Sequence, residues 1–167
     1  RSLAYLSSQM ENHDQEDEAA AKADLVIGKL PYRDGQAILV DPRPEAPSFA
    51  VAHQDMMNVE NFTVEVFFQP RSVYETGTVR TLVSKWDGNS KSPGWSLGIT
   101  GKGSRRKPQT VVLLMHGTLA SGSIGEAAIF SDQHVALNKP YYLGASFQAA
   151  TNDRPGTVTF YLKDLSN

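Results

Sequence analysis

The spacing of apolar residues constrains this chain more than any other feature of its sequence. Within residues 61–69, Phe62, Val64 and Val66 alternate with other residues at a period of two. That period places successive side chains on opposite faces of an extended strand. The same alternation recurs from Gln36 towards the end of the chain, so we expect a fold built from β-strands.

The pattern predicts eight short strands, separated by Gly, Pro, Asn and Asp residues that favour turns. They cover residues 36–41, 48–53, 61–69, 78–85, 94–100, 109–116, 141–148 and 156–163. In residues 109–116 both faces are apolar, which indicates a central strand covered on both sides. The expected fold is therefore all-β, a two-sheet antiparallel sandwich of the jelly-roll type.

The first part of the chain has a different period. Leu3, Leu6 and Met10 recur at helical spacing, and an acidic run and an alanine-rich stretch follow them. Alanine, glutamate and glutamine are strong helix formers, so we expect a helix within residues 2–23. The predicted organisation is an N-terminal helical and acidic extension over residues 1–30 and a β-sandwich over residues 31–167.

Composition narrows the classes of function. The chain has 167 residues, a formal net charge of −2 and no cysteine. A near-neutral charge gives no pull towards nucleic acid, and the missing thiols exclude disulfides and thiolate metal sites. No apolar run approaches the roughly 20 residues that span a bilayer, so we expect no membrane insertion. Because the chain begins at Arg1 rather than at methionine, we expect neighbouring domains of a longer protein.

Three phrases of the sequence carry a family likeness in a fixed order. They are residues 61–70 (NFTVEVFFQP), residues 81–86 (TLVSKW) with residues 94–99 (GWSLGI), and residues 156–164 (GTVTFYLKD). Together they resemble the strands of laminin-G-like domains in the concanavalin A-like lectin/glucanase superfamily, over about residues 36–164. The resemblance implies a concanavalin A-like jelly roll, an extracellular or periplasmic location, and a glycan or protein ligand.

The chain departs from the family pattern near its end. Leu165 follows Asp164 where the family usually has a turn glycine. Members of the family also continue through further strands that close the sandwich, whereas this sequence stops at Asn167. An uncovered sheet edge is a pairing hazard, so we expect strands from elsewhere, or the N-terminal segment, to cover it.

Catalysis is not expected. Retaining glycosidases, the nearest enzymes on such a scaffold, need two carboxylates about 5–5.5 Å apart, but the predicted strands carry almost single acids, such as Glu65 and Asp164. Glu16 and Glu18 have the right separation in sequence, but on a helix they would not face each other. No metal site is predicted either, because no two of the four histidines, His13, His53, His116 and His134, have helical i, i+4 spacing.

A basic loop is the first candidate binding surface. It carries four cations within six residues: Lys102, Arg105, Arg106 and Lys107. The resemblance implies that such a patch can bind sulfated glycans by charge. The simpler interpretation is a solvated hairpin tip.

A tryptophan beside a turn is the second candidate. Trp86 precedes Asp87-Gly88-Asn89, and Tyr74, Tyr141 and Tyr142 are further aromatic candidates near loops, where we expect them to be exposed. Sugar recognition combines aromatic faces with planar polar groups, which Asp87 and Asn89 provide. The alternative is that Trp86 only packs at a strand end. The resemblance also allows calcium, for which Asp87 and Asn89 are weak candidate ligands, since two oxygens do not make a site.

These observations predict a non-catalytic binding or interaction module with a glycan or protein ligand. Two alternatives stay open, a purely structural spacer without a small ligand and a degenerate glycoside hydrolase-like domain.

Overall fold

The strand with two apolar faces lies inside a sheet, as its sequence predicts. In the computed structural model of the chain, strand β6 (Thr110–Thr118) pairs with a neighbour on each side in a four-stranded sheet. The structure describes residues 26–29, 36–39, 50–118 and 122–166. Val111, Val112 and Leu113 on β6 are fully buried.

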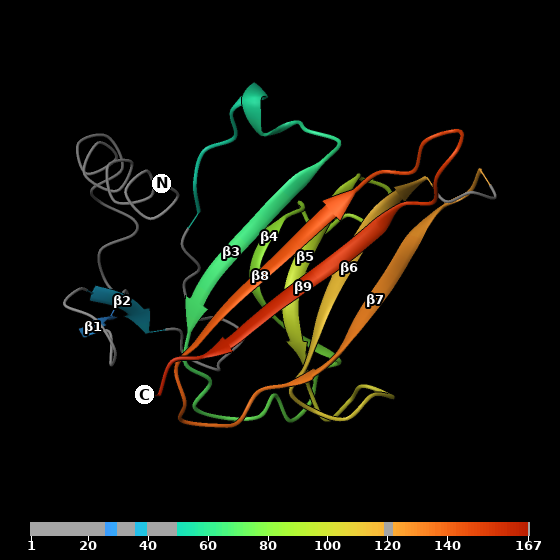
Figure 1. Cartoon of the computed structure of the whole chain (residues 1–167). Coiled ribbons are helices and arrows are strands. Elements are labelled where there is room, and N and C mark those ends of the chain that lie inside the picture. Colours follow the sequence, from blue (N-terminus) through green and yellow to red (C-terminus); the bar gives the residue numbers. More distant parts are fainter. Residues whose placement is uncertain (1–25, 30–35, 40–49, 119–121, 167) are drawn as a thin grey trace. The chain divides into compact units, whose positions relative to one another are not determined.

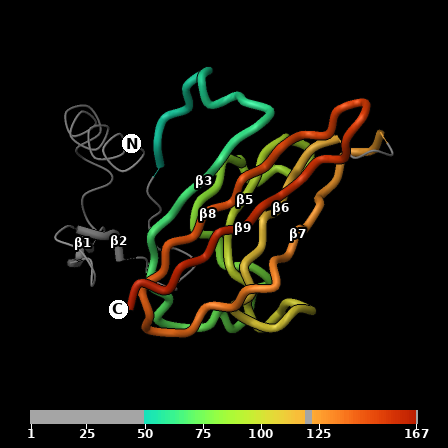
Figure 2. Tube along the Cα trace, viewed as in Figure 1, coloured from blue at the N-terminus to red at the C-terminus, as the bar shows by residue number. Residues whose placement is uncertain are grey.

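Two antiparallel sheets pack face to face as a sandwich, with the three-stranded sheet in front in Figure 1. The order of the four-stranded sheet is β4-β5-β6-β7 and that of the three-stranded sheet is β3-β8-β9. Their strands, besides β6, are β3 (Phe62–Phe68), β4 (Val79–Lys85), β5 (Gly94–Thr100), β7 (Ile124–His134), β8 (Tyr141–Gln148) and β9 (Thr157–Asp164). The chain trace in Figure 2 shows β3 beside β8, which follows it much later in the sequence.

The inner faces of the two sheets form the hydrophobic core. Leu97 and Ile99 on β5 and Leu113 on β6 face Leu143 and Ala145 of the other sheet, all within one buried cluster. Alternate residues of each strand supply these contacts, as expected when two sheets pack through their inner faces. Apolar burial of this kind is the main favourable contribution to folding.

The segment before Glu60 forms a separate unit of the chain. Its described elements are β1 (Val26–Lys29), β2 (Gln36–Leu39) and the short 3-10 turn η1 (Asp55–Met57), and β1 and β2 pair antiparallel. Among the described residues, η1 is the only helical element. Among all the residues that the structure describes, no helix has the length and apolar character needed to cross a membrane.

The strand predictions agree closely with the structure over residues 61–116 and 141–164. Two expected strands, Gly94–Thr100 and Tyr141–Gln148, have the predicted bounds. The prediction for residues 48–53 is wrong for the described residues 50–53, which form no strand. The prolines before this segment limit ladder pairing. The predicted helix over residues 2–23 lies outside the described residues.

Two strands have no counterpart among the predictions, β1 and β7. Strand β7 spans Ile124–His134 and pairs with β6 along most of its length. Its inward positions include Ala127 and Ile129, and its remaining positions mix small, charged and polar residues with the apolar Ile124 and Phe130. This composition gives a weak alternation signal, which explains why the strand is not evident from the sequence.

An ion pair joins the start of β8 to the end of β9. Lys139 Nζ donates to Asp164 Oδ2 at 2.9 Å, and the backbone N–H and hydroxyl of Ser166 both donate to Asp164 Oδ1. These bonds, of which those from Ser166 and Lys139 are the largest causes, lower the pKa of Asp164 to about 2. The same contact raises the pKa of Lys139.

Truncating the core should destabilise the domain strongly. We expect Leu113→Ala to lower the free energy of unfolding by about 2–5 kcal/mol, because it removes a fully buried side chain and leaves a cavity. Leu137→Ala is the matched control, since Leu137 is 39% exposed. Urea unfolding measures both variants. Equal losses would contradict the assignment of Leu113 to the core.

The Asp164 carboxylate should add an acid-dependent contribution to stability. Its pKa in the folded protein, about 2, is below the ordinary 3.8, so this contribution is present above pH 3.8. It is lost as the pH falls towards 2, because protonation then removes the bonds to Lys139 and Ser166. Thermal unfolding of the protein and of Asp164→Asn between pH 7 and pH 2 should therefore show the gap in Tm closing in acid. A difference in Tm that stays constant over this pH range would show that ionisation of Asp164 does not contribute to stability.

Candidate functional site

The outward face of the four-stranded sheet is buried at several central positions, although it does not face the core. On β5, Trp95, Leu97 and Ile99 point inward, so Ser96 and Thr100 point outward, yet these two are 3% and 1% exposed. On β6, His116 has the same outward parity as Val112 and is 7% exposed. Side chains from loops cover parts of this face, as Trp86 covers His116 and Arg106 covers Phe130. A binding site can form beside such a cover.

At one end of this face, an indole ring lies flat on an imidazole. Trp86, directly after β4, stacks on His116 of β6 with ring centroids 3.8 Å apart and planes 5° apart. The stack depends on Gly94, because a Cβ there would lie 2.8 Å from the Cβ of Trp86 and 2.4 Å from the Lys85 carbonyl oxygen. A side chain at position 94 would therefore displace the tryptophan or the adjoining strand.

The loop after Trp86 is held by its own hydrogen bonds. Asp87 Oδ1 accepts from the backbone N–H of Asn89 at 2.8 Å, and Asp87 Oδ2 accepts from the Ser92 hydroxyl at 2.7 Å. The indole N–H of Trp86 donates to the Asn89 carbonyl at 2.9 Å. The bond from Ser92, followed by that from Asn89, lowers the pKa of Asp87. Gly88 has a φ of +81°, as the predicted turn requires.

In the structure, the side chains of Asp87 and Asn89, the predicted ligand groups, accept hydrogen bonds from within the loop. The side-chain oxygen of Asn89 accepts from the backbone N–H of Lys91 at 3.0 Å. Both residues shape the turn that positions Trp86 over the sheet. Among the described residues, no cluster of three or more His, Cys, Asp or Glu residues could hold a metal ion.

His116 carries one of two buried side-chain polar atoms of the described residues that make no hydrogen bond, the other being Gln109 Oε1. The Nε2 of His116 is buried and makes no hydrogen bond to any described residue. The nearest charged group is Glu126 on β7, whose Oε2 lies 3.7 Å away, beyond ordinary hydrogen-bond length. The His116 side chain is 3% exposed and that of Glu126 is 51% exposed. A buried nitrogen without a partner costs free energy and calls for an explanation.

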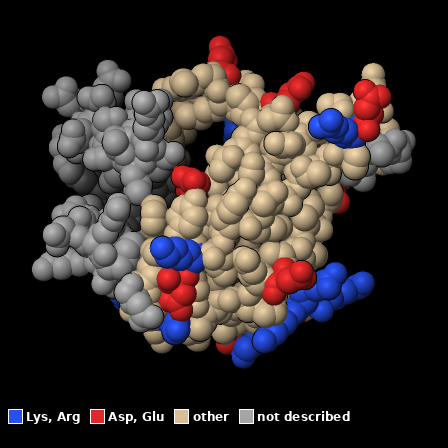
Figure 3. All heavy atoms as spheres, in the orientation of Figure 1, with Lys and Arg blue, Asp and Glu red and all other residues tan. Residues whose placement is uncertain are grey.

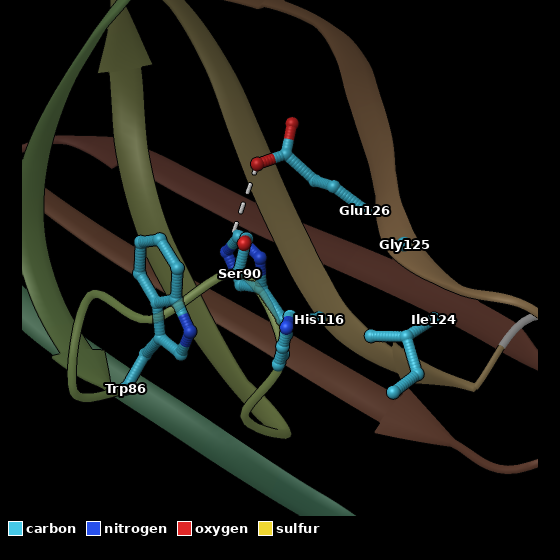
Figure 4. A pocket seen from close by; sticks show the side chains of 7 residues that line it. Trp86, Ser90, His116, Ile124, Gly125 and Glu126 are labelled. Atoms are coloured by element: carbon cyan, nitrogen blue, oxygen red, sulfur yellow. Dashed lines mark ion pairs between the residues drawn. The ribbon is translucent and has the colours of Figure 1, made fainter.

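An open pocket of about 500 Å³ lies beside this histidine. Figure 4 shows Trp86 and His116 on one side and Glu126 and Ile124 on the other, with the His116–Glu126 ion pair dashed. The lining residues are Trp86, Ser90, Lys91, His116, Ile124, Gly125 and Glu126. The volume lies in the range of small-ligand sites, which combine apolar walls with a few polar groups.

The basic loop lies towards the other end of the same face. The guanidinium of Arg106 lies 5.1 Å from the ring centroid of Phe130 on β7, which pairs with Val112. Val112 and His116 are four residues apart on β6, a span of about 13 Å along a strand. Sequence reasoning treated the two candidate surfaces separately, and the structure places both on one sheet face.

Not all four loop cations are free to bind. Lys102 Nζ pairs with Glu75 at 2.7 Å. Arg105 and Lys107 are exposed and form no ion pair with a described residue. Figure 3 shows Lys and Arg side chains gathered at the lower right of the molecule, where the loop before β6 lies in Figure 1.

The three tyrosines proposed as exposed platforms are dispersed. Tyr141 is 5% exposed and belongs to the core, where its hydroxyl accepts from the backbone N–H of Ala136, so the expectation of exposure is wrong. Tyr142 lies on the three-stranded sheet. Tyr74 lies under the Arg80 guanidinium, 5.5 Å from it.

Sequence reasoning missed His116 and Glu126 as site residues. His116 could have been found from its position, because it is an even number of residues from Val112 and so lies on the same outward face of β6, which is buried. Glu126 lay on a strand that was not predicted. Comparison of the chain with protein-family models, curated proteins and solved structures gave no match.

Replacing Asp87 should release Trp86 from His116. We expect Asp87→Ala to remove two bonds of the turn and to shift the Trp86 indole N–H resonance and the near-UV circular dichroism. Asp87→Asn keeps one side-chain oxygen for the Asn89 N–H and should shift these signals less. If the alanine variant kept the indole signal of the original protein, the loop would not depend on this carboxylate.

Proposed function

We propose that the domain is a non-catalytic binding module whose pocket beside Trp86 and His116 takes a saccharide. The observation that carries the proposal is the buried Nε2 of His116, which makes no hydrogen bond to a described residue and lies 3.7 Å from Glu126 Oε2. A small movement of the half-exposed Glu126 side chain would admit a ligand hydroxyl to this nitrogen, which would return the free energy that its isolation costs.

Sugar hydroxyls suit both polar groups of the pocket. A hydroxyl can donate and accept at once, so it can accept from Nε2–H of His116 while it donates to the Glu126 carboxylate. Ser90 and Lys91 supply further hydrogen-bonding groups at the rim. The bond to the ionised carboxylate should be the stronger of the two, because charge-assisted hydrogen bonds exceed neutral ones.

The apolar wall suits the C–H surfaces of a sugar ring. Ile124 is 55% exposed, and Trp86 is partly exposed beside it. His116 occupies one face of the indole, so the ligand would contact the rest of the Trp86 side chain. A mixed wall of this kind favours a ligand with both C–H and hydroxyl groups over a purely apolar one.

The lining residues favour binding over hydrolysis. They contain a single carboxylate, that of Glu126. The glycosidase mechanism based on paired acids needs a second carboxyl group about 5–5.5 Å away for retention, or about 6.5–9.5 Å away for inversion. The proposal therefore assigns Glu126 to ligand binding.

The proposal also includes the finer assignments that rest on resemblance: a laminin-G-like, concanavalin A-like jelly roll and an extracellular or periplasmic location. Strands β3, β5 and β9 form where the matching phrases stand in the sequence, which supports the first. The second follows only from the family likeness.

His116→Phe is the sharpest test of the pocket. Phenylalanine keeps an aromatic ring against Trp86 but has no Nε2, so binding of a neutral oligosaccharide should weaken about tenfold or more. The same change should leave the free energy of unfolding unchanged or raise it, since it removes a buried nitrogen without a partner. Titration calorimetry against a panel of oligosaccharides, with and without calcium, and urea unfolding measure the two effects.

Glu126→Gln serves as the matched variant. It keeps the shape of the side chain and one acceptor oxygen, so it should weaken binding less than Glu126→Ala. Binding that survives His116→Phe unchanged would remove the pocket from the proposal. An absence of binding to every saccharide of the panel would leave the structural spacer as the better description.

A further inference from the structure

The outward face of the three-stranded sheet presents an aromatic surface that the pocket does not use. Phe67 on β3 pairs with Tyr142 on β8, and on the next outward-facing rung Glu65 pairs with Gly144, which pairs with Tyr161 on β9. Three aromatic side chains from three adjacent strands therefore share one face. Tyr161 is 51% exposed, so its ring is open to a ligand.

Gly144 lets the two tyrosines lie close to the sheet. A Cβ at this position would lie 3.1 Å from the Tyr142 hydroxyl oxygen and 3.5 Å from Cδ2 of Tyr161. The two rings thus flank a strip of bare backbone, and a larger residue would crowd the Tyr142 phenol. Cross-strand aromatic residues can shield a glycine in this way, but shielding alone does not require Tyr161 to stay half exposed.

Tyr142 is fixed in place by a carboxylate. Its hydroxyl donates to Glu65 Oε1 at 2.7 Å, and this bond is the largest cause of the raised pKa of Tyr142. Its ring lies 5.3 Å from that of Phe67, at an angle of 54°. The Tyr142 part of the aromatic surface is thus held in place before any ligand arrives, which lowers the entropy cost of binding.

The surroundings of the aromatic rings are polar but nearly uncharged. On the next outward rung, Thr63 donates to the Ser146 hydroxyl at 3.1 Å, and exposed Thr159 pairs with Ser146. Figure 3 shows few charged side chains over the middle of this face. Of the two charged residues in the aromatic rungs, Glu65 is bonded to Tyr142, and Lys163 lies on the outer strand.

We infer that this face is a second binding surface, and that its ligand is a neutral polysaccharide chain lying across β8 and β9. The exposed ring of Tyr161, beside the half-buried rings of Tyr142 and Phe67, matches the C–H face of a sugar ring, and the threonine and serine hydroxyls match sugar hydroxyls. Since Glu65 is bonded to Tyr142, Lys163 is the one other charged side chain on these two rungs, so a strongly acidic or basic partner would find little charge to pair with. The inference does not depend on the pocket beside Trp86.

The test uses the full chain carrying His116→Phe, so that binding in the pocket is suppressed. Calorimetry with cellohexaose, xylohexaose and chitohexaose, and sedimentation with insoluble cellulose and chitin, should detect binding of at least one neutral polymer. Tyr161→Ala should weaken it about threefold to tenfold. Tyr161→Phe, which keeps the ring, should bind nearly as the parent does, and Thr81→Ala, at an exposed position on the other sheet, is the control.

Three results would overturn the inference. These are no binding to any of the neutral polymers, binding that Tyr161→Ala leaves unchanged, and preferential binding of a sulfated glycan such as heparin. A concentration-dependent dimer that Tyr161→Ala abolishes would show instead that the face pairs with a second copy of the chain. Since Tyr161 is half exposed, unfolding of the variant is not expected, and circular dichroism checks it.

Discussion

Contact between the inner residues of β5 and β6 and those of β8 underlies every other feature of the sandwich. Leu97, Leu113 and Leu143 are fully buried in one cluster, so their strands keep one register and one inward face. A shift by one residue would exchange inward and outward faces along the whole strand. The parity that buries Leu113 is therefore the parity that turns His116 towards the pocket.

Strand β6 shows how a site can arise from a buried position. Two of its outward residues, Val112 and His116, are buried although they belong to no second core, and Trp86 provides part of the cover at His116. A valine or leucine at position 116 would satisfy the same burial without an unpaired nitrogen. The polar residue is thus a cost to folding that a ligand can offset, which is the usual relation between stability and a binding function.

The sequence predicts the sandwich well because large apolar residues alternate in β3, β5 and β8. It fails where the signal is weak or depends on partners. Strand β7 is rich in small residues, so its period is faint, and Tyr141 is buried because its hydroxyl finds the Ala136 N–H, which no local pattern reveals. Trp86 was a candidate from its own neighbourhood. Its meeting with His116 and Glu126 depends on strand register between distant segments, which spacing along the chain does not supply.

The two outward faces of the sandwich are separated by the thickness of the core, about 10 Å between sheets. Substitutions that far apart, without shared partners, usually act additively. Changes at Tyr161 and at Ile124, which lie on opposite sheets, can therefore accumulate separately, and selection can adjust one surface while the other stays as it is. Because the faces point away from each other, two polymer strands held at once would be joined through the domain, which would then act as a cross-link rather than as a simple anchor.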